Sequence, residues 1–413
     1  MKKRVLLISI FFIVYIVYFA VATEFSFKPK WALDYFNPLA NSLLNFRLDI
    51  QNPLITYDLS FFQGKWFTPW GILPSLILIP LQLIKGHFIP LLYLSVFFAS
   101  LNTVFVYLIL KRLKTEFFPR LSLVNIFFLL VLFAFGTANF YVGTLGSTWH
   151  VDQIVTSFLI TLGIYVIFKK NRKIKDYLIS AIIFSITLLG RPTGIMLLTL
   201  PLCLYLADNL PLQKLLSKKL HFLKNIFFIF GLPFLFFTVL FFLYNYVRFK
   251  NPIEFGFSHI HESAYLAQIR QINGAFSIKN ILSNTWFMIF EIPTITFTDK
   301  FNFIFNLKGN SIFFLTPPFL AIFLASPIKK ITGRIVFDPY VLSLWVSIIA
   351  TIVPSLTHYG SGWMQFGYRY TLDITVLLII LSIFGMKGKL NVLYILGIIF
   401  SIILYFWGIN ILM

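Results

Sequence analysis

Residues 1–22 read MKKRVLLISIFFIVYIVYFAVA, in which three basic residues precede an apolar run of about 18 residues. A helix of about 20 apolar residues spans the roughly 30 Å hydrocarbon core of a bilayer. Similar runs recur along all 413 residues, of which 59% are hydrophobic and 12% charged. The composition therefore predicts an all-α polytopic membrane protein. The first run could be a signal peptide ending at residues 20–22, but its length favours a retained first span.

Eleven spans are expected, near residues 5–22, 88–110, 121–141, 152–168, 177–190, 194–208, 225–247, 311–327, 340–356, 373–386 and 390–411. The two longest connections, about 23–87 and 248–310, leave no room for a sizeable soluble domain. Residues 1–413 are thus predicted to form a single integral membrane domain with two longer external loops that carry interfacial helices. Segment 71–86 is apolar but short and contains two prolines, so we expect it to lie in or dip into the outer interface.

The formal net charge of +20 comes from basic clusters in the short connections. These clusters lie near residues 2–4, 111–120, 169–175, 214–224, 329–334 and 387–389. The positive-inside rule makes their side cytoplasmic, which predicts a cytoplasmic N-terminus and an external C-terminus in a plasma (inner) membrane protein. No basic stripe lies on a soluble module, so the expected partner is the lipid bilayer and no nucleic acid is expected. The single cysteine, Cys203, excludes an intrachain disulfide.

The first external loop contains two candidate catalytic acids. Asp34 begins the stretch DYFNPLA, and Asp58 begins DLSFFQGKWF, which is followed by PWG and Pro74. A carboxylate at the membrane surface can act as a general base toward an acceptor hydroxyl. The alternative for each is a loop aspartate that caps a short helix.

The next external turns carry an acid–imidazole pair and an arginine. His150 and Asp152 lie in GSTWHVD, where a span begins. Ionisable residues at such a position are often functional, although Asp152 could simply favour the positive end of its helix. Arg191 lies in GRPTG, between two spans, where an arginine is costly without an anionic partner. A phosphate matches the guanidinium fork, and the alternative is a side chain that snorkels to the interface.

Two later motifs also border spans on the external side. They are YNYVRFKNPIEFG at 244–256 and GSGWMQFGYRYTLD at 360–373. Their candidate site residues and near neighbours are Tyr244, Tyr246, Arg248, His261, His358, Trp363, Tyr368, Arg369 and Tyr370. The histidines and Glu262 after the first motif match no strong zinc pattern, so no cofactor is predicted and a divalent metal is not indicated.

Taken in order, the segments DLSFFQGKWFTPWGILP (58–74), GRPTG, YNYVRFKNPIEFG and FGYRYTLD (366–373) resemble the C-type (GT-C) polyprenyl-phosphate-dependent membrane glycosyltransferases. The resemblance is to a mostly uncharacterised bacterial branch related to protein O-mannosyltransferases and aminoarabinose transferases. It implies a catalytic acid in the first external loop, which Asp34 or Asp58 would match. The usual early pair is Asp-Glu, whereas Tyr35 follows Asp34 here.

The expected function is an inverting glycosyltransferase that moves a sugar from a polyprenyl-phosphate sugar to an envelope acceptor, either a lipid, a glycan or a protein. Arg191, Arg248 and Arg369 are expected to bind the donor phosphate. One alternative is a lipid-linked sugar flippase or transporter, which would place binding charges at the bilayer midplane. Another is a non-catalytic envelope-assembly protein with the same fold.

Overall fold

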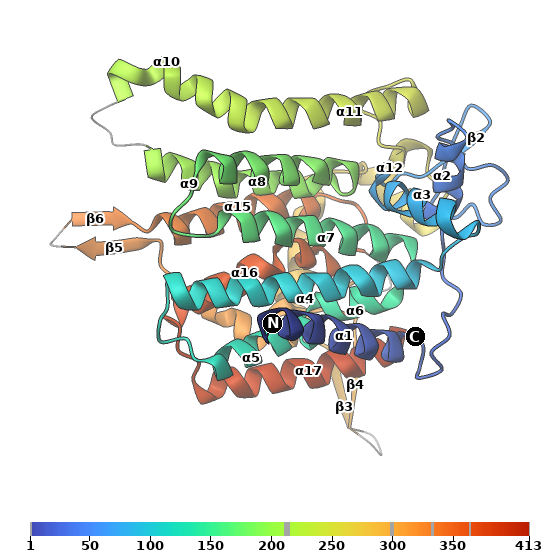
Figure 1. The fold of residues 1–413 in the computed structure, drawn as a ribbon. Coiled ribbons are helices and arrows are strands. Elements are labelled where there is room, and N and C mark those ends of the chain that lie inside the picture. Colours follow the sequence, from blue (N-terminus) through green and yellow to red (C-terminus); the bar gives the residue numbers. More distant parts are fainter. Residues whose placement is uncertain (1, 210–214, 298–300, 332–333, 363–364, 413) are drawn as a thin grey trace.

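The computed structural model describes residues 2–209, 215–297, 301–331, 334–362 and 365–412. Its long helices lie side by side in layers, from α11 (Leu232–Phe249) on one face to α17 (Val392–Leu412) on the other (Figure 1). Between them lie α1 (Lys2–Ala22), α4 (Leu91–Glu116), α7 (Thr148–Ile167) and α15 (Pro339–Leu356). The described part of the chain contains seventeen α-helices.

Within the described residues, six helices are long and apolar enough to cross a bilayer. They cover Arg4–Ala22, Leu91–Glu116, Thr148–Ile167, Phe222–Phe249, Pro339–Leu356 and Val392–Leu412. A seventh candidate is the pair α5 (Leu123–Phe135) and α6 (Ala138–Leu145), bent by 41°. Large apolar side chains face outward on these helices, as at Ile13 and Phe236, which suits a lipid environment. The mostly helical architecture is compatible with the predicted membrane class, whereas the count of eleven spans stays a prediction.

The other four expected spans are helical but short or interrupted. α8 (Ile174–Ile186), η1 (Thr187–Leu189), η2 (Pro192–Leu198) and α9 (Thr199–Asn209) cover 177–208. α14 (Ile312–Leu315) and η6 (Pro317–Leu324) cover most of 311–327, and α16 is Leu372–Gly385. Prolines start η2 and η6, and a proline inside a helix lacks the N–H that would continue the hydrogen-bond ladder. Each piece is therefore shorter than one bilayer crossing.

The two ends of the bundle differ in character. One end, here called the basic end, carries the connections 111–120, 169–175 and 387–389, which pack together through Phe117, Phe168 and Phe384. The opposite end, here called the loop end, carries α2 (Phe36–Leu44), α3 (Leu73–Lys85), α12 (Ala264–Asn273) and the end of α17 (Figure 1). These three basic connections, which the sequence assigned to one side of the membrane, therefore lie together at one end of the bundle.

The loop end is built from short elements. Segment 71–86 forms α3, which contains Pro80 and packs on α2 through the Ser75 hydroxyl and the Gln82 amide. The second long loop contributes α12, α13 (Lys279–Thr285) and the hairpin of β3 (Thr294–Phe297) and β4 (Phe301–Ile304). The helix at 71–86 is as predicted, and its depth in a bilayer stays a prediction.

The sequence did not predict strands, yet the described residues form three antiparallel hairpins. Besides β3–β4 they are β1 (Ser60–Phe62) with β2 (Lys65–Phe67), and β5 (Ile328–Ile331) with β6 (Arg334–Phe337) at the basic end. The turn of the first hairpin uses Gln63 and Gly64, both at positive φ. A two-residue turn of this kind favours a hairpin, and the surrounding apolar composition concealed the signal.

Candidate functional site

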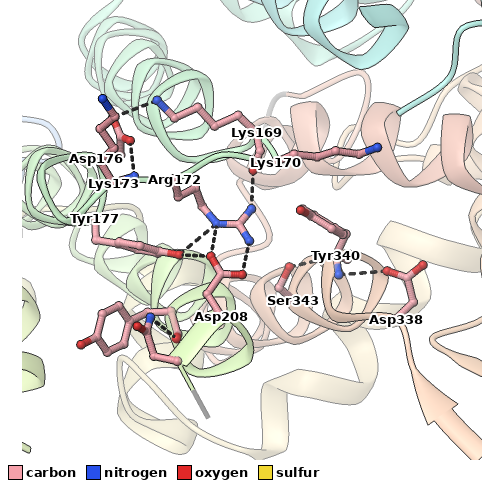
Figure 2. Close-up of polar contacts among 12 residues, drawn as sticks. Lys169, Lys170, Arg172, Lys173, Asp176, Tyr177, Asp208, Asp338, Tyr340 and Ser343 are labelled. Atoms are coloured by element: carbon pink, nitrogen blue, oxygen red, sulfur yellow. Dashed lines mark hydrogen bonds and ion pairs between the residues drawn. The ribbon is translucent and has the colours of Figure 1, made fainter. Parts of the chain in front are cut away.

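Acidic side chains at the basic end are all engaged in structural contacts. They are Glu116, Asp176, Asp208 and Asp338, each of which accepts hydrogen bonds. Figure 2 shows Arg172 donating to both oxygens of Asp208, at 2.6 and 2.8 Å. In the same view Lys169 pairs with Asp176 at 2.9 Å, and Asp338 caps α15. These acids stabilise local structure, so the search for chemistry moves to the loop end.

Asp58 is positioned where the two long loops pair with each other. Its backbone N–H donates to the His261 carbonyl at 2.6 Å, and the His261 N–H donates to the Leu59 carbonyl at 2.8 Å. Asp58 has a φ of 62°, a region that non-glycine residues rarely occupy. The carboxylate then reaches the start of α7, where Trp149 Nε1 donates to Asp58 Oδ2 at 3.1 Å. Segments far apart in sequence thus converge on this carboxylate.

The surroundings of Asp58 favour a base. Burial raises the pKa of Asp58 to about 6, and the nearby Glu262 carboxylate adds to the rise. The Trp149 hydrogen bond and the positive charge of Arg369 act in the opposite direction. A carboxyl with such a pKa is mostly ionised near neutral pH and binds a proton more readily than an ordinary aspartate.

Arg369 presents a positive charge to the same site. It begins η7 (Arg369–Thr371), and its backbone is held by Gln365 Oε1, which accepts from the Arg369 N–H at 2.9 Å. Among the described residues no carboxylate or carbonyl accepts a hydrogen bond from its guanidinium, and its buried Nε has no partner. The guanidinium carbon lies 5.5 Å from the centre of the Tyr370 ring. An unpaired guanidinium in a partly buried position favours an anionic ligand.

Arg191 lies on the same tyrosine ring but already has a partner. Its guanidinium carbon is 5.1 Å from the Tyr370 ring centre, and its NH2 group is 3.2 Å from Asp373 Oδ2. The anionic partner that the GRPTG turn was expected to need is therefore present within the chain. A phosphate contact by Arg191 stays a prediction, and the ion pair gives this arginine a structural role as well.

The GRPTG turn packs tightly against the segment that follows Asp58 in sequence. A Cβ on Gly71 would lie 2.1 Å from the Leu189 carbonyl oxygen, so only glycine fits there. On the other side of the turn, a Cβ on Gly190 would lie 3.5 Å from Asp152 Oδ1. The turn thus lies between the first loop and α7 and forms part of the wall of the site.

His150 and Asp152 are buried at the start of α7. His150 Nδ1 bonds with the Ser147 hydroxyl at 2.6 Å, and its Nε2 has no partner among the described residues. Asp152 Oδ1 also has no partner there, and its electrostatic neighbours are Arg191, Asp373 and Arg369. Both side chains therefore border the Arg369 site with unused hydrogen-bonding capacity.

Arg248 is occupied by contacts within the protein. It is 3% exposed, donates to the Thr68 carbonyl and to Asn245 Oδ1, and stacks on the Tyr244 ring at 3.7 Å. These contacts attach the end of α11 to the segment after β2. Tyr246, two residues earlier, is about half exposed on the outside of α11. The geometry gives Arg248 an anchoring role, and its expected phosphate contact stays a prediction.

Asp34 caps a helix, as the alternative interpretation anticipated. Its Oδ1 accepts from the Asn37 N–H at 3.0 Å and its Oδ2 from the Asn37 side chain at 2.5 Å. Burial raises its pKa, while the Asn37 hydrogen bonds lower it. Tyr35, the next residue, stacks on Trp70, and Trp70 contacts Trp149. Asp34 thus adjoins Tyr35 at one end of this row of three aromatic rings, and Asp58 bonds to Trp149 at the other end.

The remaining candidates lie in the second long loop and in the connection between α15 and α16. His261 Nδ1 bonds with the Thr56 hydroxyl at 2.8 Å. Burial lowers the pKa of His358 to about 4, so this imidazole is neutral near pH 7. Tyr368 is fully buried, and its hydroxyl has no partner among the described residues. Trp363 lies outside the described residues.

Comparison with protein-family models, curated proteins and solved structures found no match. The resemblance to GT-C glycosyltransferases therefore rests on the sequence motifs alone and stays a prediction. Within the described residues no group of three or more His, Cys, Asp or Glu could hold a metal ion.

The sequence reading missed several residues of the site. Trp149 was not among the candidates, although it lies directly before His150 in the motif GSTWHVD. Asp373 closes the FGYRYTLD segment, and Glu262 follows His261. A tryptophan N–H near a helix start and a carboxylate four residues after an arginine were the available signals. Neither reveals its partner, because both contacts join distant segments.

Proposed function

We propose that this chain is an inverting glycosyltransferase that moves a sugar from a polyprenyl-phosphate donor to a hydroxyl acceptor at its loop end. One observation supports this above all. A carboxylate with a raised pKa, Asp58, and an unpaired guanidinium, Arg369, share a site at one end of an apolar helical bundle. A general base and a cation for a phosphate leaving group are the two groups that this transfer requires.

In the proposed reaction Asp58 accepts the proton of the acceptor hydroxyl. The hydroxyl oxygen then attacks the anomeric carbon on the face opposite the phosphate. The bond between the anomeric carbon and the phosphate oxygen breaks, and its electron pair leaves with the lipid phosphate. Arg369 stabilises the charge that develops on that phosphate, and Arg191 lies on the same Tyr370 ring to assist it.

The distribution of buried charge favours this function over a transporter. Buried acidic and basic side chains in the described helices lie at a cap or near a helix end. They are Asp152 just after the first turn of α7, Asp176 in α8, Arg248 in α11, Asp338 at α15 and Asp373 in α16. A secondary transporter typically binds its substrate and coupling ions near the bilayer midplane. Charges near the ends of a bundle, rather than at its middle, suit a reaction at the membrane surface instead.

The test uses the purified full chain with a polyprenyl-phosphate sugar and scores released lipid phosphate in the presence of envelope-derived acceptors. We expect release by the wild type and a loss of about 10²–10⁴-fold in Asp58→Asn, which retains shape but cannot accept the proton. Glu24→Gln is the matched control, because Glu24 is an exposed carboxylate of the same loop, paired only with Lys30. Equal release by Asp58→Asn and the control would refute Asp58 as the base.

A further inference from the structure

A large groove opens at the loop end, and Asp34 and Tyr35 are among its lining residues. Its volume is about 860 Å³, within the range of small-molecule sites. Its walls are residues 29–35, the exposed side of α2, residues 45–55 and residues 88–92 at the start of α4. Neither Asp58 nor Arg369 lines it. The groove is thus distinct from the site proposed for sugar transfer.

Amide side chains are the most numerous kind of polar group in the lining of the groove. Four amide side chains line it: Asn41, Asn45, Gln51 and Asn52. Asn45 Nδ2 donates to the Asn41 carbonyl at 2.8 Å, whereas the Asn41 side chain has no protein partner among the described residues. An amide offers both donors and acceptors, which matches the hydroxyl groups of a sugar.

The two cationic side chains that line the groove, Lys30 and Arg47, already have anionic partners. Lys30 pairs with Glu24, and Arg47 pairs with Asp49. The Asp34 carboxylate is bonded to Asn37 through both oxygens. An anionic ligand would have to compete with these carboxylates for each cation, in contrast to the open guanidinium of Arg369. The groove therefore favours an uncharged ligand.

Apolar side chains complete the walls. Trp31, Leu54 and Phe88 line the groove and are strongly exposed. An exposed apolar surface that lies beside convergent polar groups is typical of a ligand-binding site. The C–H faces of pyranose rings pack on such surfaces while their hydroxyls reach the amides.

The inner wall of the groove adjoins Asp58. Tyr35 lines the groove, and its hydroxyl donates to the carbonyl of Tyr57, the residue before Asp58. Burial, and then the nearby Asp58 charge, raise the pKa of Tyr35. A glycan bound in the groove would thus have one end close to Asp58, the proposed base.

From these features we propose that the groove binds an uncharged glycan, several sugar units long, through the Asn41 amide and the Trp31 ring. That this glycan is the part of the acceptor remote from the reacting hydroxyl rests on the proposed function. The binding of a glycan in the groove does not depend on that function.

The test measures binding of neutral tetrasaccharides of glucose, mannose, galactose and N-acetylglucosamine to the detergent-solubilised full chain, by saturation-transfer NMR. Asn41→Ala and Trp31→Ala should each weaken binding of the preferred tetrasaccharide by about tenfold. Both side chains are exposed, so folding should survive their removal. Asn171→Ala, an exposed amide at the basic end, is the matched control and should bind like the wild type.

Two results would overturn the proposal: no tetrasaccharide binds, or binding is the same in both groove variants as in Asn171→Ala. Stronger binding of a sulfated tetrasaccharide than of its neutral parent would overturn the uncharged assignment. Asp58→Asn separates this proposal from the enzymatic one, because it should lose transfer yet retain glycan binding. Glycan binding by a wild-type chain that shows no transferase activity would leave the groove assignment standing and remove the proposed function.

Discussion

Replacing Trp149 by phenylalanine should move the pH dependence of sugar transfer. The change keeps an aromatic ring at the start of α7 but removes the N–H that donates to Asp58 Oδ2 at 3.1 Å. That hydrogen bond stabilises the ionised carboxylate, so its loss should raise the pKa of Asp58 above its value of about 6.

The size of the shift follows from the hydrogen bond. A hydrogen bond to a charged group contributes about 1.5–3 kcal/mol, and one pKa unit corresponds to about 1.4 kcal/mol. Because solvent reaches part of Asp58, the lower end applies, a rise of about one unit. A base must be ionised to act, so the rate falls as pH drops through its pKa. Trp149→Phe should then be about fivefold slower than wild type at pH ~6 and nearly equal to it at pH ~8.

The assay is kcat/KM for the polyprenyl-phosphate sugar between about pH 5 and 9, which reports the pKa of the base in the free enzyme. Trp66→Phe is the control: it changes a tryptophan of the same loop end that stacks on Phe61 and makes no hydrogen bond to Asp58 among the described contacts. An acid limb at the same pH in Trp149→Phe and Trp66→Phe would refute the role of Asp58 as base.

Three further outcomes are expected. Asp34→Asn should leave transfer within a few fold of wild type. Asp34→Ala, which removes the cap of α2, should lower the unfolding free energy by about 0.5–2 kcal/mol in a denaturant titration. A loss of transfer in Asp34→Asn like that of Asp58→Asn would restore Asp34 as the base. Arg369→Ala should raise the donor KM strongly, and Arg369→Lys should recover only part of it because the planar fork is lost; unchanged donor kinetics in both would exclude phosphate binding there. A reporter fused after Met413 should behave as external, and cytoplasmic activity would overturn the predicted topology.

Hydropathy and charge predicted the helical class and the separation of basic connections from the long loops, because both are local properties of the chain. Hydropathy and charge could not determine how many times the chain crosses the membrane. The break near Gly136 divides one expected span into α5 and α6, and prolines 192 and 317 shorten others. Whether such pieces together cross a bilayer depends on how they pack, and no residue pattern contains that information.

The sequence motifs predicted which segments meet, but not what each side chain does there. GRPTG, the Asp58 segment and FGYRYTLD do lie together. Three arginines were expected to bind the phosphate, but two of them have partners within the protein. Arg248 donates hydrogen bonds to Thr68 and Asn245, and Arg191 forms an ion pair with Asp373. Among the described contacts only Arg369 has an unpaired guanidinium. These differences arise from partners up to 182 residues apart in sequence, so a single segment cannot reveal them.

Unsatisfied polar atoms carry the strongest argument about where a ligand binds. Buried polar groups are nearly always hydrogen-bonded, and each unpaired one costs about 1–3 kcal/mol. In the described structure His150 Nε2, Asp152 Oδ1, Tyr368 OH and Arg369 Nε are buried without partners. Two come from the start of α7 and two from the segment before α16. Other buried atoms without partners in the described structure, such as Thr351 Oγ1 and Tyr394 OH, lie elsewhere in the bundle. These four, however, come from two segments that contact each other, since the Gln153 amide donates to the Arg369 carbonyl. A ligand that bonds to both segments at once would recover that free energy, and a phosphate-linked sugar carries both the charge and the hydroxyls to do so.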